Sequence, residues 1–138
     1  MATKIFVNLP VKELQRAVDF FCQLGFHFNA QFSDDNAACL MVSADIHIML
    51  LVEKYFNSFT HKPSADARRT SEMILSISAE SRQKVDELFE KALKAGGRAY
   101  GDTQDEGWMY ARGFEDLDGH MWEFMWMDKE DVDTTPGR

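Results

Sequence analysis

The sequence has little cysteine, little positive charge and no long hydrophobic run. Its two cysteines, Cys22 and Cys39, are too few for a disulfide framework and do not have the spacing of a zinc site. Cys22 falls in a predicted helix and Cys39 in a predicted strand, so we expect both to be small, buried, apolar side chains. Cysteines used in this way indicate a reducing compartment, and the cytoplasm is the expected location.

Basic residues are outnumbered, with 15 Lys and Arg against 23 Asp and Glu and a net charge of -8. Non-specific binding to nucleic acid depends on a basic surface that displaces counterions, so we expect no nucleic-acid partner. No apolar stretch approaches the roughly 20 residues of a membrane span, and no signal-peptide pattern is present, so we expect no membrane partner.

What the sequence does contain is a pattern that occurs twice. An apolar strand leads into an amphipathic helix that stops at glycine, and short apolar strands follow. First strand, helix and last strand fall at residues 5–9, 14–24 and 45–52 in one copy, and at 73–77, 85–95 and 119–126 in the other. The middle strands are predicted at residues 26–28 and 37–42, and at 98–100 and 108–114. Such a repeat indicates two copies of one β-α-β-β-β unit.

This pattern predicts the α+β fold class, with paired β-α-β-β-β units forming a curved sheet around a pocket and helices on the outside. The 138 residues suit one domain. We place unit one at about residues 3–53, a connection at 54–70, unit two at about 71–127 and a polar tail at 128–138. The connection shows no clear period, and its aromatic residues are expected to cover a pocket mouth or a second subunit.

The ends of the second helix carry recognisable signals. Ser78 and Ser81 are both candidates for its N-cap, since a serine hydroxyl accepts a hydrogen bond from a free backbone amide there. Gly96 is expected to end the helix with a positive φ. Residues 118–119 are predicted to form a tight turn between the last two strands.

Alternation along the strands separates a helix-packed face from a face that lines the pocket. The pocket face is predicted to carry apolar residues with a few polar ones: Phe6, Asn8, His47, Met49, Leu51, Glu72, Ile74, Ser76, Met121, Glu123 and Met125. The strand at residues 108–114 has no clear apolar side, and Trp108 and Arg112 are predicted from it as additional ligand contacts.

Two carboxylates on an apolar face require an explanation, because an unpaired charge is costly to bury. Glu72 and Glu123 could bind a metal ion, or they could share a proton as an acid/base pair. Alternatively, either could lie at the rim of the pocket in contact with water, which is the simpler reading for Glu72 at the start of its strand.

Two segments resemble one known family. Residues 8–14, followed by 20–21 and 24–26, match the opening of the vicinal-oxygen-chelate superfamily, and residues 114–123 match its closing strand. This superfamily includes glyoxalase I, the bleomycin- and fosfomycin-resistance proteins and the extradiol dioxygenases. The resemblance covers residues 3–127 and implies a homodimer of paired units that binds a small molecule, commonly with a divalent metal.

The metal ligands implied by the resemblance are only partly present. Glu123 matches the glutamate of the last strand, and Glu72 stands where histidine is usual. The other two positions fall on Phe6 and Met49, which are not ligands for a hard divalent ion. His47, on the same face as Met49, would complete a set with Glu72 and Glu123 for Zn, Ni, Mn or Fe. His120 has the helix-side alternation and is expected to be structural.

The sequence leaves the function open among three alternatives. The first is a small-molecule-binding protein, which as an enzyme would be a lyase or isomerase of the glyoxalase kind. Glu123 or Glu72 would then be the catalytic base, with the other carboxylate, a metal or Asn8 stabilising an enolate. The second is a protein that sequesters a drug or metabolite without turnover. A ring-cleaving dioxygenase, which needs two histidines and a glutamate around iron, fits least.

Overall fold

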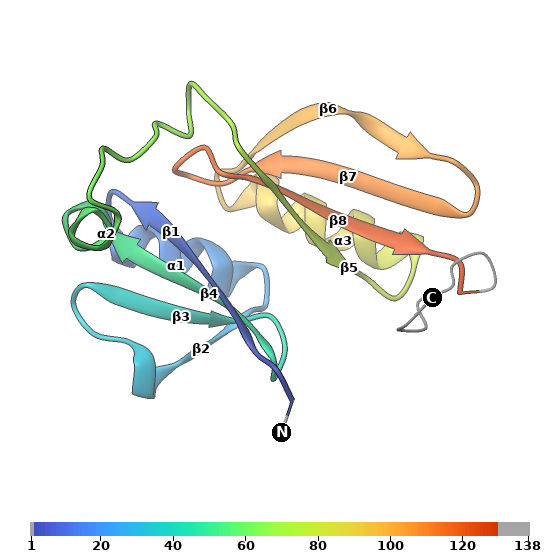
Figure 1. Ribbon diagram of the computed structural model, residues 1–138. Coiled ribbons are helices and arrows are strands. Elements are labelled where there is room, and N and C mark those ends of the chain that lie inside the picture. Colours follow the sequence, from blue (N-terminus) through green and yellow to red (C-terminus); the bar gives the residue numbers. More distant parts are fainter. Residues whose placement is uncertain (1, 130–138) are drawn as a thin grey trace. The chain divides into compact units, whose positions relative to one another are not determined.

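The computed structural model describes residues 2–129, which form the predicted β-α-β-β-β pattern twice (Figure 1). The first copy comprises β1 (Ile5–Val11), α1 (Leu14–Gln23), β2 (His27–Asn29), a short 3-10 helix (Ala30–Phe32), β3 (Ala37–Met41) and β4 (Ile46–Val52). α2 (Glu53–Thr60) follows it. The second copy comprises β5 (Ile74–Ser78), α3 (Arg82–Lys94), β6 (Arg98–Asp105), β7 (Met109–Glu115) and β8 (Met121–Met127). The predicted α+β class and the repeat are confirmed.

The described residues form two compact units. Unit 1 holds the chain up to Thr70 together with the turn Leu117–Gly119, and unit 2 holds Ser71–Asp116 and the described residues from His120 onward. Each unit has one four-stranded sheet, ordered β1-β4-β3-β2 in unit 1 and β5-β8-β7-β6 in unit 2. In both sheets the first pair is parallel and the other two pairs are antiparallel. The last nine residues of the predicted tail lie outside the described range.

One helix covers one face of each sheet and builds the core there. α1 packs on β3 and β4, and α3 packs on β6, β7 and β8. In unit 2 the interior contains Phe89 of α3 with Phe114, Trp122 and Phe124 of the sheet, each at most 4% exposed. Burying a side chain of this size stabilises the fold by roughly 2–3 kcal/mol.

The ends of α3 follow the sequence signals. Ser81 is the N-cap, with its hydroxyl accepting a hydrogen bond from the Lys84 amide at 3.0 Å. Gly96 follows the helix with φ 110°. Both predictions are confirmed, and of the two candidate serines it is Ser81, the nearer to the helix, that caps it.

The connection between the units contains a helix, and one sequence-based prediction is wrong. Residues 53–60 form α2 in a segment for which the sequence showed no clear period, and contacts with β1 and β4 support this helix. Cys22 is exposed, whereas Cys39 is completely buried. The buried stripe of α1 is Ala17, Phe20, Phe21 and Leu24, which turns position 22 toward solvent.

An ion pair on unit 2 gives a test of stability against pH. Arg82 of α3 holds the Asp105 carboxylate with two hydrogen bonds of 2.7 and 2.8 Å, and the Gly107 amide donates a third of 3.0 Å. Mainly through the Arg82 hydrogen bonds, the pKa of Asp105 falls from 3.8 to about 2. A carboxyl with a lowered folded-state pKa stabilises the fold above its unfolded pKa and loses that contribution as pH falls toward the folded value.

We therefore expect Asp105→Asn to flatten the dependence of unfolding free energy on pH between about 4 and 2. Urea denaturation at several pH values measures it. Asp102→Asn, at an exposed aspartate of the same strand, controls for the loss of one negative charge. A slope unchanged in Asp105→Asn would show that the pair does not act on stability.

No helix within residues 2–129 has the length and apolar character to cross a membrane.

Candidate functional site

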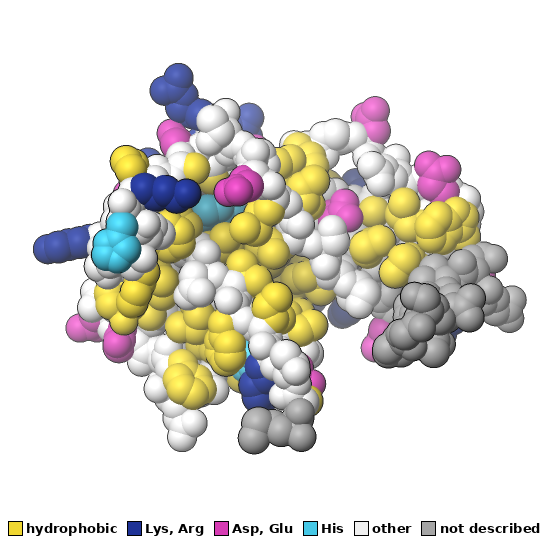
Figure 2. Space-filling view, viewed as in Figure 1, with side chains coloured by type: hydrophobic (Ala, Val, Ile, Leu, Met, Phe, Trp, Pro, Cys, Tyr) yellow, Lys and Arg dark blue, Asp and Glu magenta, His cyan; other side chains and the backbone are white. Residues whose placement is uncertain are grey.

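Each sheet has one face that its helix does not cover, and we call this the open face of the unit. In Figure 2, which views the molecule as in Figure 1, hydrophobic side chains gather on these faces. On unit 1 the open face carries Phe6, Asn8, Cys39, Met41, His47, Met49 and Leu51, and on unit 2 it carries Ile74, Ser76, Tyr100, Ala111, Gly113, Met121, Glu123 and Met125. Phe6 and Ile74 are exposed, at 46% and 51%.

The predicted faces of the last strand are confirmed. Trp122 and Phe124 of β8 are each 1% exposed beneath α3. Their neighbours Met121, Glu123 and Met125 are half-buried on the other side of the sheet. Glu123 therefore projects from the middle of a strand among methionines, as its alternation predicted.

Four residues form one row across the open face of unit 2. Ser76 of β5 lies opposite Glu123 of β8, Glu123 lies opposite Gly113 of β7, and Gly113 lies opposite Tyr100 of β6. Directly opposed residues on neighbouring strands have adjacent side chains on the same face. The row therefore brings together a hydroxyl, a carboxylate and a phenol, with a position between them that has no side chain.

Gly113 creates the space that the Tyr100 ring fills. A Cβ atom at Gly113 would lie 2.6 Å from Cζ and 2.9 Å from the hydroxyl oxygen of Tyr100. Only glycine permits this approach, so the Tyr100 ring lies over the β7 backbone at Gly113. Sequence reasoning missed Tyr100; a tyrosine and a glycine on adjacent antiparallel strands were the available signal, but it required the register.

The Tyr100 hydroxyl is buried, and within residues 2–129 it has no hydrogen-bond partner. Burial raises the pKa of this phenol, and the carboxylates of Glu123 and Glu115 raise the pKa further. The hydroxyl is therefore a neutral hydrogen-bond donor at neutral pH. A buried donor without an acceptor is rare, because it has lost its hydrogen bond to water without replacement.

Glu123 is held on one side only. Ser76 Oγ donates to Glu123 Oε1 at 2.6 Å, and in the described part of the chain this is the carboxylate's one hydrogen bond. Oε2 therefore has no donor among the residues that the structure describes. An ionised carboxylate offers several acceptor positions, and most of those on Glu123 remain unused.

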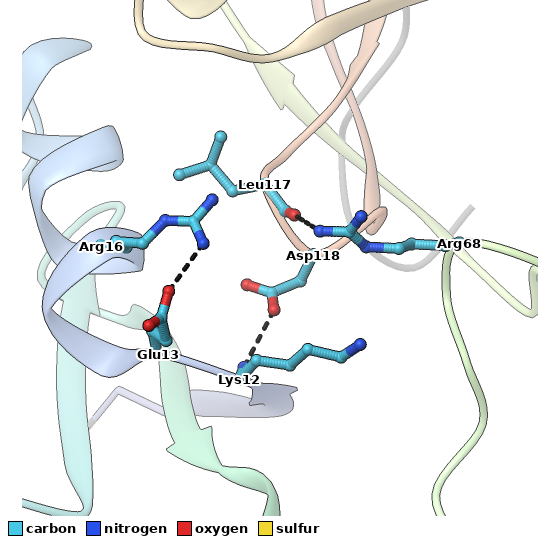
Figure 3. Close-up of a pocket in the computed structure, with 6 residues that line it drawn as sticks. All are labelled: Lys12, Glu13, Arg16, Arg68, Leu117 and Asp118. Atoms are coloured by element: carbon cyan, nitrogen blue, oxygen red, sulfur yellow. Dashed lines mark hydrogen bonds and ion pairs between the residues drawn. The ribbon is translucent and has the colours of Figure 1, made fainter.

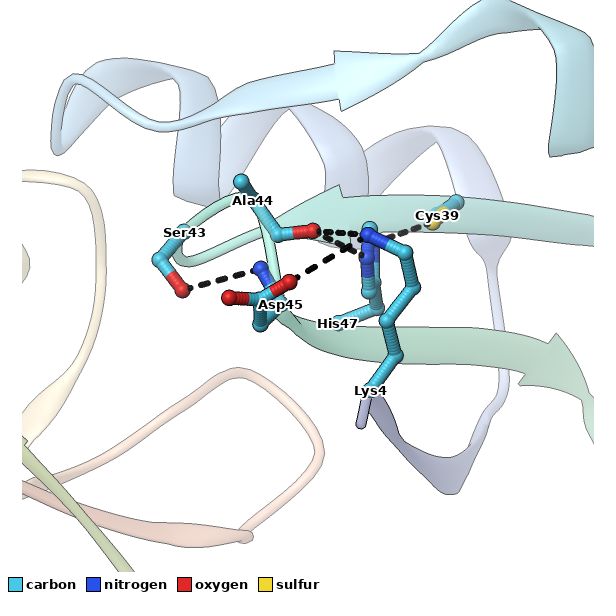
Figure 4. Close-up of polar contacts among 6 residues, drawn as sticks. All are labelled: Lys4, Cys39, Ser43, Ala44, Asp45 and His47. Atoms are coloured by element: carbon cyan, nitrogen blue, oxygen red, sulfur yellow. Dashed lines mark hydrogen bonds and ion pairs between the residues drawn. The ribbon is translucent and has the colours of Figure 1, made fainter. Parts of the chain in front are cut away.

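His47, on the open face of unit 1, is already engaged at both ring nitrogens (Figure 4). Nε2 lies 3.2 Å from the Ala44 carbonyl oxygen, and Nδ1 lies 3.5 Å from Cys39 Sγ. A carbonyl only accepts, so Nε2 carries the proton and Nδ1 accepts from the Cys39 thiol, whose pKa is raised by burial. Phe6 stacks on the ring at 4.6 Å, and His47 is 4% exposed.

The hydrogen bonds of His47 bear on the metal site predicted from the sequence. Its Nδ1 lone pair accepts from the Cys39 thiol at 3.5 Å, so a metal ion would have to displace that contact. Across residues 2–129 no three His, Cys, Asp or Glu residues form a group that could hold a metal ion. The roles of His47, Glu72 and Glu123 as metal ligands therefore stay predictions.

The other predicted site residues lie in different surroundings. Glu72 lies in an exposed bend two residues before β5, not within the strand. Asn8 is exposed and opposite Met49, and Trp108 is 43% exposed in the turn before β7. None of these positions has a ligand contact that tests its role, so each stays a prediction.

Arg112, predicted as a ligand contact from a strand with no clear apolar side, lies on the helix-packed face of unit 2, and its role toward a ligand stays a prediction. Its Nη1 is 3.0 Å from Oδ1 of Asp86 in α3, and its guanidinium lies 3.8 Å from the centre of the Phe89 ring. Tyr110, on the same side, donates to Asp86 at 2.6 Å. Arg112 therefore joins α3 to the sheet.

Unit 1 has two surface depressions, which are weaker candidates for a binding site than the open face of unit 2. The pocket in Figure 3 is lined by Lys12, Glu13, Arg16, Arg68, Leu117 and Asp118 and has a volume of about 20 Å³, which suits one water molecule. A groove of about 350 Å³ between α1 and residues 28–38 is larger. In this groove Asp34 Oδ1 already accepts from the amides of Asn36 and Ala37.

The comparisons with known proteins agree on the family. The family model described as "Glyoxalase/Bleomycin resistance protein/Dioxygenase superfamily" matches residues 5–124. No curated protein matches the sequence significantly.

Solved structures share the fold across nearly the whole chain. Hypothetical protein SA1046 from S. aureus is 25% identical with a TM-score of 0.77, covering 91% of this chain and 95% of that one. A glyoxalase/bleomycin resistance protein/dioxygenase family enzyme from Burkholderia phytofirmans PsJN is 14% identical, with a TM-score of 0.78 and coverage of 91% and 99%. The fosfomycin resistance protein FosX from Listeria monocytogenes, complexed with Mn(II) and sulfate, is 16% identical, with a TM-score of 0.68 and coverage of 94% of each chain.

Proposed function

Because the chain belongs to the glyoxalase/bleomycin resistance protein/dioxygenase superfamily, we propose that it binds a small organic molecule on the open face of unit 2, with Glu123 as the polar anchor. The observation that carries this proposal is the half-buried Glu123 carboxylate, which has one oxygen held by Ser76 and the other without a donor among residues 2–129. Met121 and Met125 flank it on β8 and supply adaptable apolar surface for a ligand.

Direct contact between Glu123 and the ligand gives the first test. In a thermal-shift screen of metabolite-like and drug-like compounds, we expect stabilising compounds whose effect is smaller in Glu123→Gln, because the amide cannot replace a charged acceptor. Glu87→Gln, at an exposed glutamate of α3 paired with Lys84, is the matched control and should retain the full shift. Equal shifts in wild type and Glu123→Gln for every compound would contradict the proposal.

The same assay separates direct contact from binding through a metal. We expect the shift to survive dialysis against EDTA, because the ligand contacts the carboxylate itself. A shift that EDTA abolishes and Mn(II) or Zn(II) restores would instead favour Glu72 and Glu123 as metal ligands. Stoichiometric metal in protein purified without a nickel column would support the same alternative.

Proton transfer is a second candidate function. With Oε1 fixed by the Ser76 hydroxyl, the free Oε2 of Glu123 is placed to take a proton from a carbon next to a ligand carbonyl and return it. Such a lyase or isomerase would exchange that proton with deuterium from solvent, and Glu123→Gln would stop the exchange. Binding without exchange would leave sequestration as the function.

The homodimer also remains a proposal. Tyr55 and Phe59 of α2 form an exposed edge-to-face pair, 39% and 60% accessible with ring centres 4.9 Å apart. Exposed aromatic pairs are common at interfaces between subunits. Sedimentation velocity would show a dimer in wild type, and Phe59→Ser should shift the equilibrium toward monomer if α2 contributes to the contact.

A further inference from the structure

We infer that Tyr100 is a ligand-binding residue which, with Glu123, selects molecules that carry a hydrogen-bond donor beside a carbonyl-type acceptor, such as a primary amide. This inference rests on the proposed function and names the ligand class of the same face. Tyr100 and Glu123 flank Gly113 in one row, so both polar groups lie on the open face across a single position without a side chain.

The Tyr100 hydroxyl and the Glu123 carboxylate are a hydrogen-bond donor and an acceptor, and each has unused hydrogen-bonding capacity. Within the described residues the Tyr100 hydroxyl has no acceptor, and Glu123 has a donor only at Oε1. They do not bond to one another. A ligand whose N–H donates to Glu123 and whose oxygen accepts from Tyr100 would satisfy both groups. Binding would thereby remove the free-energy cost of leaving a buried polar group without a hydrogen bond.

The charges around the row favour a neutral or cationic ligand. Glu123 and Glu115 lie on the same face as Tyr100, and their carboxylates hold the phenol in its protonated, donating form. The nearest cation along β6 is Arg98, which lies opposite Glu115 in the register. A ligand carboxylate beside Glu123 would meet a like charge in a partly buried place, which is unfavourable.

Removing the hydroxyl of a ligand-binding tyrosine should affect stability differently from removing the hydroxyl of a tyrosine that stabilises the fold. Tyr110, on the neighbouring strand but the opposite face, donates to Asp86 at 2.6 Å and serves as the matched comparison. Removing a satisfied hydroxyl destabilises a protein, whereas removing an unsatisfied buried one is neutral or stabilising. Tyr100→Phe should leave the urea midpoint unchanged or raised, and Tyr110→Phe should lower it.

Titration with benzamide, N,N-dimethylbenzamide and benzoate, followed by NMR, tests the selection. We expect benzamide to bind wild type and Tyr110→Phe equally, and to bind Tyr100→Phe and Glu123→Gln about five- to tenfold more weakly, the effect of one hydrogen bond. N,N-dimethylbenzamide has no N–H, so Glu123→Gln should not change its weaker binding. Benzoate should be the weakest of the three.

Three outcomes would overturn the inference: no benzamide binding to wild type at its solubility limit, equal binding to Tyr100→Phe, or benzoate binding as well as benzamide. The thermal-shift screen keeps this failure distinct from failure of the proposed function. If the screen finds compounds whose binding depends on Glu123 but not on Tyr100, the proposed binding face is supported and the role of Tyr100 is rejected. If no compound requires Glu123, both are rejected.

Discussion

Replacing Gly119 with alanine is expected to lower the free energy of unfolding by about 3 kcal/mol, the combined effect of strain and overlap. Gly119 has φ 90°, a conformation that side chains rarely adopt, and it lies in the turn between β7 and β8. A Cβ there would also lie 2.8 Å from the backbone nitrogen of Arg68. Backbone cannot move aside as a flexible side chain can, so the turn has to shift.

The contacts that hold this turn in unit 1 would be strained by the shift (Figure 3). The Lys12 amide donates to Asp118 at 2.9 Å, and Arg68 donates to the Leu117 carbonyl at 2.6 Å. Gly107→Ala is the matched control, because Gly107 has φ 85° but open space where its Cβ would lie. It should cost only about 1 kcal/mol, from backbone strain. Equal losses in urea denaturation would show that overlap with Arg68 does not matter.

Replacing Asp116 with alanine is expected to lower the free energy of unfolding by about 3 kcal/mol. The change removes a buried charged acceptor and leaves its donors without a hydrogen-bond partner. Asp116 is 7% exposed, and its carboxylate accepts from Trp122 Nε1 at 2.9 Å and from the His120 amide at 3.0 Å. The Trp122 indole is itself 1% exposed, so water cannot replace the lost acceptor.

A double-mutant cycle with Trp122→Phe isolates this hydrogen bond. Trp122→Phe removes the indole donor, so Asp116→Ala should cost about 1–2 kcal/mol less in that background than in wild type. Urea denaturation of the four proteins gives the coupling. Strict additivity would mean that Asp116 acts through the turn alone and not through the tryptophan.

The fold could be predicted from the sequence because its two periodicities are strong and occur twice. Strict alternation on β8 placed Trp122 and Phe124 under the helix and Glu123 on the other face, as the structure confirms. Where alternation is ambiguous, as on β7, the sequence did not decide which side faces the helix. In the structure the side with Tyr110 and Arg112 packs against α3.

The candidate site could be predicted only in part, because it depends on register and not on pattern. Glu123 was found from its own strand. Tyr100 was missed because its significance lies in the pairing of β6 with β7, which sets it opposite Gly113. His47 was placed on the correct face, but its hydrogen bonds to Ala44 and Cys39 depend on how the β3–β4 turn folds, which no local spacing encodes.

The most direct test of the account is to locate a bound compound on unit 2 with methionine-methyl and indole NMR signals. Titration with the compound that gives the largest thermal shift should move the methyl signals of Met121 and Met125 on the open face. The indole N–H signal of Trp122, buried under α3 and bonded to Asp116, should stay in place, and Glu123→Gln should reduce the methyl shifts at the same compound concentration. Movement of the Trp122 signal with both methyl signals unchanged would contradict the account and place the ligand on the helix-packed side.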